Sequence, residues 1–283
     1  MTKSAKILLA IIIFIGMSAA LIHISFAGTV GNTATVEDPK GAGVFSLKKT
    51  RNFAIKTGAD MEFVLDRDIK ASAAADSEIT SAQWYMGKIS CVLFNRVEPY
   101  VKFGMAHMKV KWNEDGKNVK VESNNGFAWS LGGKVLVWDF ERPNLRLVAD
   151  GFYRVAELDM QKGSQDGAIV EMDRGGSAFF MREWQISLIA ATDIDVSTMS
   201  SGSDFLGVTR IVPYAGVKYS DISGRLRTIW TSGNYNNPGQ IRSDRKFGLV
   251  AGCDFVGPNS VSLNLEGRFI DETAITAGLQ VLL

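Results

Sequence analysis

Ten segments of this chain, each between nine and fifteen residues long, alternate apolar residues with polar or small ones. A period of two is typical of β-strands, in which successive side chains point to opposite faces. Each segment approaches the length that a tilted strand needs to cross a bilayer. The predicted strands are Phe53–Leu65, Ala82–Phe94, Tyr100–Trp112, Gly126–Asp139, Leu145–Leu158, Ala178–Thr192, Arg210–Ser220, Phe247–Phe255, Ser260–Phe269 and Thr273–Leu282.

Short and long connections mostly alternate between these segments, as in outer-membrane barrels, which have short periplasmic turns and long surface loops. The short turns carry proline, glycine or asparagine and are Asn95–Pro99, Glu141–Asn144 and Gly257–Asn259. The predicted surface loops are Asp66–Ser81, Asn113–Asn125, Asp159–Ser177 and Asp221–Lys246. Two connections break the pattern, because Asp193–Thr209 is long and Ile270–Glu272 is short. Twelve strands therefore stay open as an alternative, with one further strand within Asp193–Thr209 and another at Ser223–Thr231.

The N-terminus has the order of a secretory signal. Lys3 and Lys6 precede an apolar run that ends at Ile24, and small residues at Ser25 and Ala27 suit a signal peptidase. We expect residues 1–27 to be a signal peptide cleaved near Ala27, 28–49 a periplasmic lead-in, and 50–283 the barrel. No later run reaches about 18 apolar residues, so any further crossing requires a closed barrel.

The predicted fold class is all-β, an antiparallel transmembrane up-and-down β-barrel of about ten strands. A soluble β-sandwich shows the same alternation, but the export signal and the connections favour the barrel. Aromatic residues near strand ends could form an interface belt: Trp84, Tyr85, Trp112, Trp129, Trp138, Tyr153 and Tyr219. Arg182 shares an outward face with Trp184 and Ile186, so we expect it at a membrane edge, because a midplane arginine costs about 2–4 kcal/mol.

Charged residues gather on the face that would point inward. Eight are basic and five acidic: Lys56, Lys88, Lys102, Lys134, Arg146, Arg154, Lys218 and Arg268, with Asp60, Glu62, Asp150, Glu183 and Glu266. A dry interior cannot leave such charges unpaired. They either pair into a plug or line a water-filled pore, and a barrel of ten or twelve strands has a width that allows both.

The sequence offers little catalytic or metal-binding chemistry. His107 is the one histidine after the signal peptide, and it shares the outward face of its strand with Phe103 and Met105. We therefore predict no enzyme activity, no catalytic residue, no metal site and no cofactor. Asp193 and Asp195 are predicted to lie in a solvated turn, and the two cysteines, Cys91 and Cys253, to stay unpaired on separate strands.

The run Pro213–Ser220, preceded by Glu183-Trp184-Gln185, resembles the late strands of chlamydial-type major outer-membrane porins. Gly248–Gly252 and Ser262–Phe269 resemble the closing strands of that family and of small opacity-type barrels. The chain lacks the many cysteines of those porins, and it ends in Leu282-Leu283 rather than in the aromatic residue that resembles an assembly signal. The resemblance implies an outer-membrane location and assembly by the barrel-assembly machinery.

The predicted function is porin-like passive diffusion of small solutes, with a slight anion preference from the eight-to-five inward charges. The alternative is a non-conducting surface barrel for adhesion or envelope structure, followed by a barrel protease or a lipid-modifying enzyme. The expected partners are outer-membrane lipid, the barrel-assembly machinery and small solutes, and the sequence is compatible with a homo-oligomer. The near-neutral mature chain has no block of like charge, which excludes nucleic acid as a partner.

Overall fold

The computed structural model describes residues 53–72, 74–94, 96–114, 116–140, 144–170, 172, 176–196, 208–230, 238–257 and 261–283. The predicted signal peptide and lead-in lie outside these residues. The described part of the chain contains no helix that is long and apolar enough to cross a membrane.

The described residues form one antiparallel sheet. Its strands are β1 (Phe53–Ala71), β2 (Ala75–Leu93), β3 (Val97–Glu114), β4 (Lys117–Ser123), β5 (Gly126–Phe140), β6 (Leu145–Gln165), β7 (Ala168–Val170), β8 (Ala178–Thr192), β9 (Ile194–Asp195), β10 (Arg210–Arg227), β11 (Gly239–Ser243), β12 (Phe247–Val256), β13 (Val261–Phe269) and β14 (Thr273–Leu282). Two of the long strands are interrupted, so β4 continues into β5 and β11 into β12.

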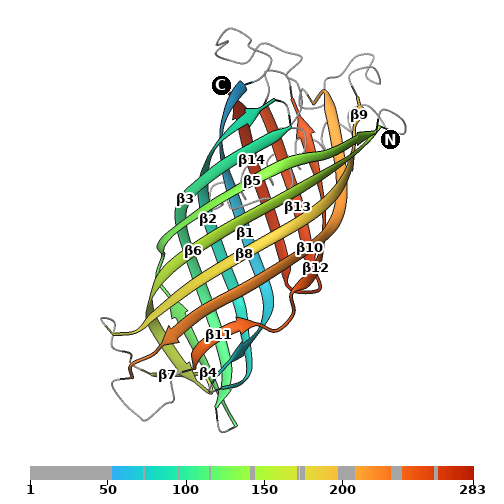
Figure 1. Cartoon of the computed structure of the whole chain (residues 1–283). Coiled ribbons are helices and arrows are strands. Elements are labelled where there is room, and N and C mark those ends of the chain that lie inside the picture. The colour runs from blue at the N-terminus through green and yellow to red at the C-terminus, as the bar shows by residue number, and fades with distance from the viewer. Residues whose placement is uncertain are drawn as a thin grey trace, which may run out of the picture.

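The sheet closes on itself through ten strands, which confirms the predicted barrel and its strand number (Figure 1). The ring runs β1, β2, β3, β5, β6, β8, β10, β12, β13 and β14, and it closes where β14 pairs with β1. The twelve-strand alternative is wrong, because residues 223–227 continue β10 instead of forming a separate strand. All ten predicted segments lie within or overlap these strands.

At one end the ring narrows from ten strands to eight. The β13–β14 hairpin stops short there, and β11 pairs with β10 on one side and directly with β1 on the other. β4 likewise joins β3 to β6. This eight-stranded half, built from β1, β2, β3, β4, β6, β8, β10 and β11, lies at the lower end of Figure 1. The rest of the ring is called the ten-stranded half.

The two halves have opposite polarity. In β3 of the ten-stranded half, Phe103 is exposed on the outside and Lys102 is buried inside. Further along the same strand, Lys109 is on the outside, whereas Met108 and Trp112 are buried inside. The ten-stranded half therefore has an apolar exterior and a charged interior, and the eight-stranded half has a charged exterior and an apolar interior.

This reversal explains why the predicted long surface loops were largely wrong. β1 continues to Ala71 and β2 begins at Ala75, so most of the segment 66–81 is strand. The segments 113–125, 159–177 and 221–246 are also partly strand. They look like loops in the sequence because their outward side chains meet water, so the lipid-facing apolar residues expected of a membrane strand are missing.

An apolar cluster fills the interior of the eight-stranded half. It includes Trp84, Trp112, Met86, Met108, Met160, Met181, Ile79, Val110, Val121, Leu158, Phe179, Leu226 and Ile241. Trp84 and Trp112 are each 1% exposed, so their predicted place in an interface belt is wrong. Trp129, Trp138 and Tyr153 do lie on the outside. A barrel of eight strands is just wide enough for side chains to fill it.

Two inward tyrosines of the ten-stranded half lie directly opposite glycines on neighbouring strands. Tyr100 pairs with Gly132 and Tyr214 with Gly252. A Cβ atom on Gly132 would lie 2.5 Å from Cζ of Tyr100, and one on Gly252 would meet the hydroxyl of Tyr214. The missing side chains let the tyrosine rings lie against the barrel wall, where aromatic residues cover strand glycines.

We predict that Gly132→Ala destabilises the barrel by about 1–3 kcal/mol, because overpacking forces a rigid ring out of its place. Gly133→Ala is the matched control, since a Cβ there approaches nothing closer than 3.7 Å. Urea unfolding of the refolded variants, followed by tryptophan fluorescence, measures the difference. Equal stabilities of the two variants would contradict the Tyr100 contact.

A buried charge network inside the barrel

The structure buries all thirteen charged residues that the sequence placed on the inward face. It adds five more, Arg67, Glu98, Asp254, Asp271 and Glu272. Among the described residues the buried charges are thus nine cations and nine carboxylates, the most exposed being Lys56 at 7%. The eight-to-five excess that suggested an anion preference disappears in this balanced set.

Four of the five added residues escaped the sequence analysis for local reasons, whereas Asp254 lies within a predicted strand, on β12. A β-bulge between Val64 and Asp66 shifts the alternation of β1 and turns Arg67 inward. Glu98 belongs to β3, although its neighbour Pro99 suggested a turn. Only the shortness of the connection after Phe269 hinted at the positions of Asp271 and Glu272, because a three-residue loop cannot reach far from the wall.

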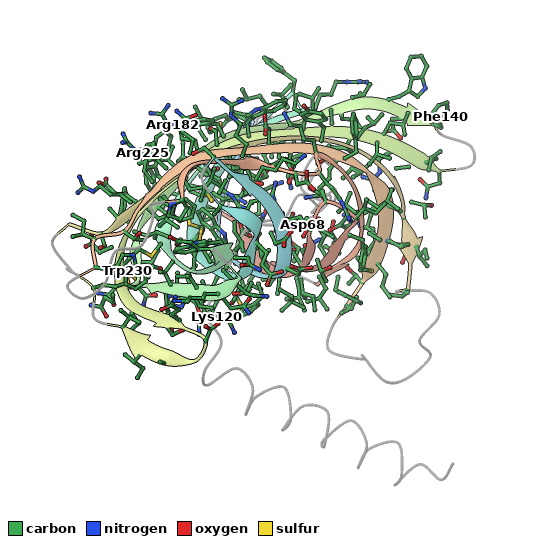
Figure 2. All side chains as sticks on the ribbon, turned by 90° about the horizontal axis from the view of Figure 1, so that it is seen from below. Asp68, Lys120, Phe140, Arg182, Arg225 and Trp230 are labelled. Carbon is green, nitrogen blue, oxygen red and sulfur yellow. The ribbon has the colours of Figure 1, made fainter. Side chains whose placement is uncertain are left out.

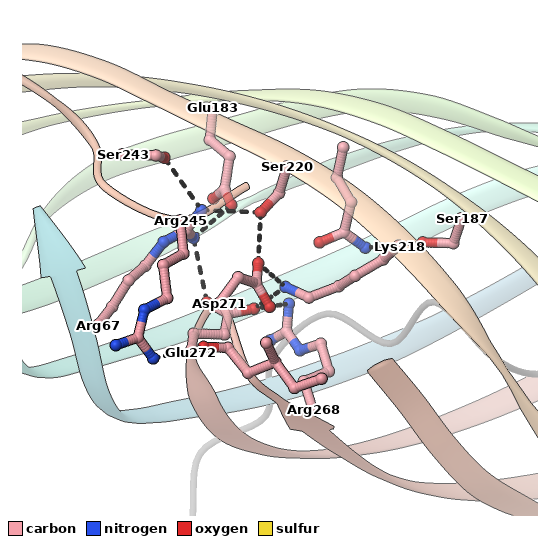
Figure 3. A network of polar contacts seen from close by, with 12 residues as sticks. Arg67, Glu183, Ser187, Lys218, Ser220, Ser243, Arg245, Arg268, Asp271 and Glu272 are labelled. Carbon is pink, nitrogen blue, oxygen red and sulfur yellow. Dashed lines mark hydrogen bonds and ion pairs between the residues drawn. The ribbon is translucent and has the colours of Figure 1, made fainter. Parts of the chain in front are cut away.

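The turn between β13 and β14 projects its two carboxylates into the barrel (Figure 3). Asp271 accepts hydrogen bonds from Lys218 at 2.7 Å and from the Ser220 hydroxyl at 2.7 Å. Gly248 on β12 faces this turn, and a Cβ atom there would collide with the Asp271 carboxylate. The narrowing of the ring and the space at Gly248 together position acidic groups in the middle of the barrel.

Three arginines and three glutamates form a closed ring of ion pairs across the interior. Arg67 contacts Glu183 at 2.6 Å and Glu272 at 3.0 Å. The ring continues from Glu272 to Arg268 at 3.1 Å, from Arg268 to Glu62 at 2.8 Å, from Glu62 to Arg154 at 2.8 Å, and from Arg154 back to Glu183 at 2.5 Å. These side chains come from β1, β6, β8, β13 and the β13–β14 turn.

The charge ring lies next to the apolar cluster, on the side of the ten-stranded half. The guanidinium carbon of Arg154 lies 3.9 Å from the centre of the Trp84 ring, a cation–π contact between the two. Lys218 joins the ring through an ion pair with Glu272. The Arg67 guanidinium also donates hydrogen bonds to the hydroxyl oxygens of Ser220, at 2.8 Å, and Ser243, at 3.5 Å. Ionised side chains in such a site are stable only when each is paired and hydrogen-bonded.

A second group of charges lies toward the end of the barrel that carries the C-terminus. Lys88 contacts Glu98 at 2.9 Å, and Lys102 contacts Asp60 at 2.8 Å. The Tyr100 hydroxyl donates to Asp150 at 3.2 Å, and the Tyr214 hydroxyl to Glu266 at 2.9 Å. Lys88 and Lys102 lie 4.7 and 5.0 Å from the centre of the Tyr100 ring. This level of the interior is also crossed by paired side chains.

The remaining candidates lie away from the network. His107 is half-buried on the outer side of β3, with Nε2 3.5 Å from Oε1 of Glu122. Asp193 pairs with Arg146 and lies 3.8 Å from Arg210, so it anchors strand ends, although the sequence predicted a solvated turn. Cys91 on β2 and Cys253 on β12 are free thiols, as predicted.

No family model and no curated protein sequence match this chain. Solved structures that are similar to it include the outer-membrane protease OmpT from Escherichia coli, with 13% identity, a TM-score of 0.36 and coverage of 82% of this chain and 96% of that one. The translocator domain of the autotransporter NalP from Neisseria meningitidis shares 10% identity, with a TM-score of 0.38 and coverage of 82% and 88%. The transport unit of the autotransporter AIDA-I from E. coli shares 11% identity, with a TM-score of 0.33 and coverage of 87% and 94%.

These similarities are too distant to indicate an activity, and the fold rests on the strand pairings described above. They include no support for the resemblance to chlamydial-type porins.

Proposed function

We propose that this chain is an outer-membrane β-barrel with a closed interior that holds its eight-stranded half outside the membrane. The ten-stranded half has the apolar exterior that lipid requires, with Phe103, Leu131, Ile186 and Leu279 among its exposed residues. The charged exterior of the other half suits water. The start of β1, the end of β14 and the turn near Asn144 then face the periplasm.

The proposal of a closed interior rests on the burial and pairing of the inward charges. Charged side chains that line an aqueous pore are wetted, whereas the buried charges described here are at most 7% exposed and pair across the lumen. Beyond them the apolar cluster fills the narrower half, and water does not enter a packed apolar core. The function best supported is the non-conducting surface barrel, which serves adhesion or envelope structure through its external half.

Conductance separates this proposal from the porin predicted by the sequence. We expect no conductance steps when refolded protein, shown by heat-modifiable gel mobility to be folded, is added to a planar bilayer. A porin recorded in the same chamber serves as the positive control. Reproducible steps from the folded protein would reject the closed interior and favour passive diffusion.

The orientation can be tested by labelling single cysteines in a Cys91→Ser, Cys253→Ser background. Lys120 is exposed on the eight-stranded half, and Asn144 lies in a turn at the opposite end. We expect a membrane-impermeant maleimide to label Lys120→Cys on intact cells and to label Asn144→Cys only after the envelope is permeabilised. The reverse labelling pattern would mean that the eight-stranded half faces the periplasm, and it would overturn the proposed orientation.

The proposal includes no catalytic role. His107 points away from the barrel interior, and its neighbour Glu122 is the one carboxylate that the described residues bring into ion-pair range of it. The outer-membrane lipid and the barrel-assembly machinery stay the expected partners, and a homo-oligomer stays a prediction.

A further inference from the structure

Three arginines form an unpaired basic cluster on the outside of the barrel, where its exterior changes from apolar to charged. Arg182 on β8, Arg225 on β10 and Arg242 on β11 are all exposed, and Figure 2 shows Arg182 and Arg225 projecting outward from the wall. Within the described residues, the side chains of these three arginines form no hydrogen bond or ion pair. Other cations of this face do pair, such as Lys246 with Asp221 at 2.9 Å and Arg245 with Asp68 at 3.6 Å.

Strand register brings the three arginines around one residue. Ser223 pairs with Arg182 on one side and with Arg242 on the other. Adjacent strands lie about 4.8 Å apart, so the two arginine backbones are separated by roughly 10 Å. Arg225 lies two residues beyond Ser223 on the same face of β10. The exposed Ser223 is thus flanked by three arginine residues, and guanidinium groups bind phosphate oxygens with paired donors.

An apolar groove adjoins this cluster. Its volume is about 310 Å³, and its lining includes Phe127, Trp129, Tyr153, Val155 and Phe180, with Arg182 at its edge. Val155 pairs directly with Arg182 across the strands, and the Arg182 guanidinium lies 4.8 Å from the centre of the Phe180 ring. Glu157 and its cross-strand partner Phe180 line the end of the groove that is farther from the ten-stranded half, two residues beyond Val155 and Arg182. An acyl chain would therefore run from Arg182 past Tyr153, away from that carboxylate.

The level of the cluster matches the surface of a membrane. Trp184, two residues after Arg182, stacks near Tyr219 with ring centres 5.0 Å apart, and Tyr219 lies 4.9 Å from Phe247. Such aromatic rows lie at the headgroup level in membrane barrels. The arginines come directly beyond this row, where the phosphates of the outer leaflet would be.

We propose that Arg182, Arg225 and Arg242, together with the groove between β5, β6 and β8, bind a phosphorylated lipid of the outer leaflet. The arginines hold the phosphate above Ser223, and the groove holds one acyl chain. This inference rests on the proposed membrane orientation. It assigns to the outer face of the barrel a specific lipid site and leaves the closed interior unchanged.

The test uses folded full-length mature protein in neutral detergent micelles, titrated with diphosphoryl lipid A as the probe. A ligand that binds only the folded state raises the melting temperature. We expect such a rise for the wild type and an apparent affinity at least about tenfold weaker for Arg182→Gln, Arg225→Gln, Arg242→Gln, since each charge-assisted hydrogen bond contributes on this scale. The matched control, Lys109→Gln, Lys111→Gln, Lys120→Gln, removes three cations from β3 and β4 and should bind like the wild type.

Two further arms separate a lipid from a free anion. Val155→Trp fills the groove and should weaken binding of lipid A, and inorganic phosphate alone should leave the melting temperature unchanged. Equal binding by the arginine variant and the wild type would overturn the site. A full response to inorganic phosphate, with no effect of Val155→Trp, would overturn its assignment to a lipid. Heat-modifiable mobility of the arginine variant, and its lack of conductance, test the closed barrel separately.

Discussion

Arg67→Met should destabilise the folded barrel by about 3–5 kcal/mol. The substitution keeps much of the side-chain length but removes the cation that bridges Glu183 and Glu272, both of which stay buried. Removing one partner of a buried ion pair strongly destabilises the folded state, because it leaves an uncompensated charge in a poorly solvated site. The interior of the variant then holds eight buried cations for nine buried carboxylates.

Arg245→Met is the control for this experiment. Arg245 is also drawn in Figure 3, but its side chain is 60% exposed and lies 3.6 Å from the exposed Asp68. A surface ion pair contributes about 0–1 kcal/mol. Urea unfolding of both variants in the same micelles compares them directly. If Arg67→Met costs no more than Arg245→Met, the ring of ion pairs does not stabilise the fold.

Trp112→Ala should cost about 3–5 kcal/mol, because it opens a large cavity in the apolar cluster of the eight-stranded half. Trp112 is 1% exposed and comes from the part of β3 that lies beyond the apolar exterior. Trp138→Ala removes a side chain of the same size that is 58% exposed on the outside of the ten-stranded half. We expect a loss of about 1 kcal/mol or less for that control.

Thermal unfolding, followed by near-ultraviolet circular dichroism, gives the comparison. A large loss for Trp138→Ala with little change for Trp112→Ala would mean that Trp112 meets lipid or solvent. That result would contradict the packed interior on which the proposed function depends.

The sequence predicted the ten-stranded half well because a bilayer demands one simple pattern. Ile186 and Leu188 face outward and Gln185 and Ser187 inward along β8, and the predicted bounds of this strand, 178–192, are those of the structure. Alternation alone was sufficient there. All thirteen inward charges that it identified are buried in the structure. The five further buried charges stand at a bulge, at a strand start, in a closing turn, or, for Asp254, on β12.

The eight-stranded half could not be predicted in the same way, because alternation does not state which face is the interior. Lys109, Val110 and Lys111 form an obvious strand pattern, but their polarity is opposite to that of Phe103. The pairing of β11 with β1 connects residues about 170 positions apart and has no local signal. The arginine cluster depends on the same long-range register, so Arg182 was predicted to lie at a membrane edge while its neighbours Arg225 and Arg242 were not identified.

The reversal of polarity along β3 also fixes how deep the barrel sits. If the protein slid outward, Phe103 and Met105 would leave hydrocarbon for water, and the hydrophobic effect would pull it back. If it slid inward, Lys109 and Lys111 would enter the hydrocarbon at a cost of up to about 2–4 kcal/mol each. The same opposition acts on every strand that crosses the boundary, so the barrel is held at one height, and its eight-stranded half projects from the hydrocarbon by a constant length.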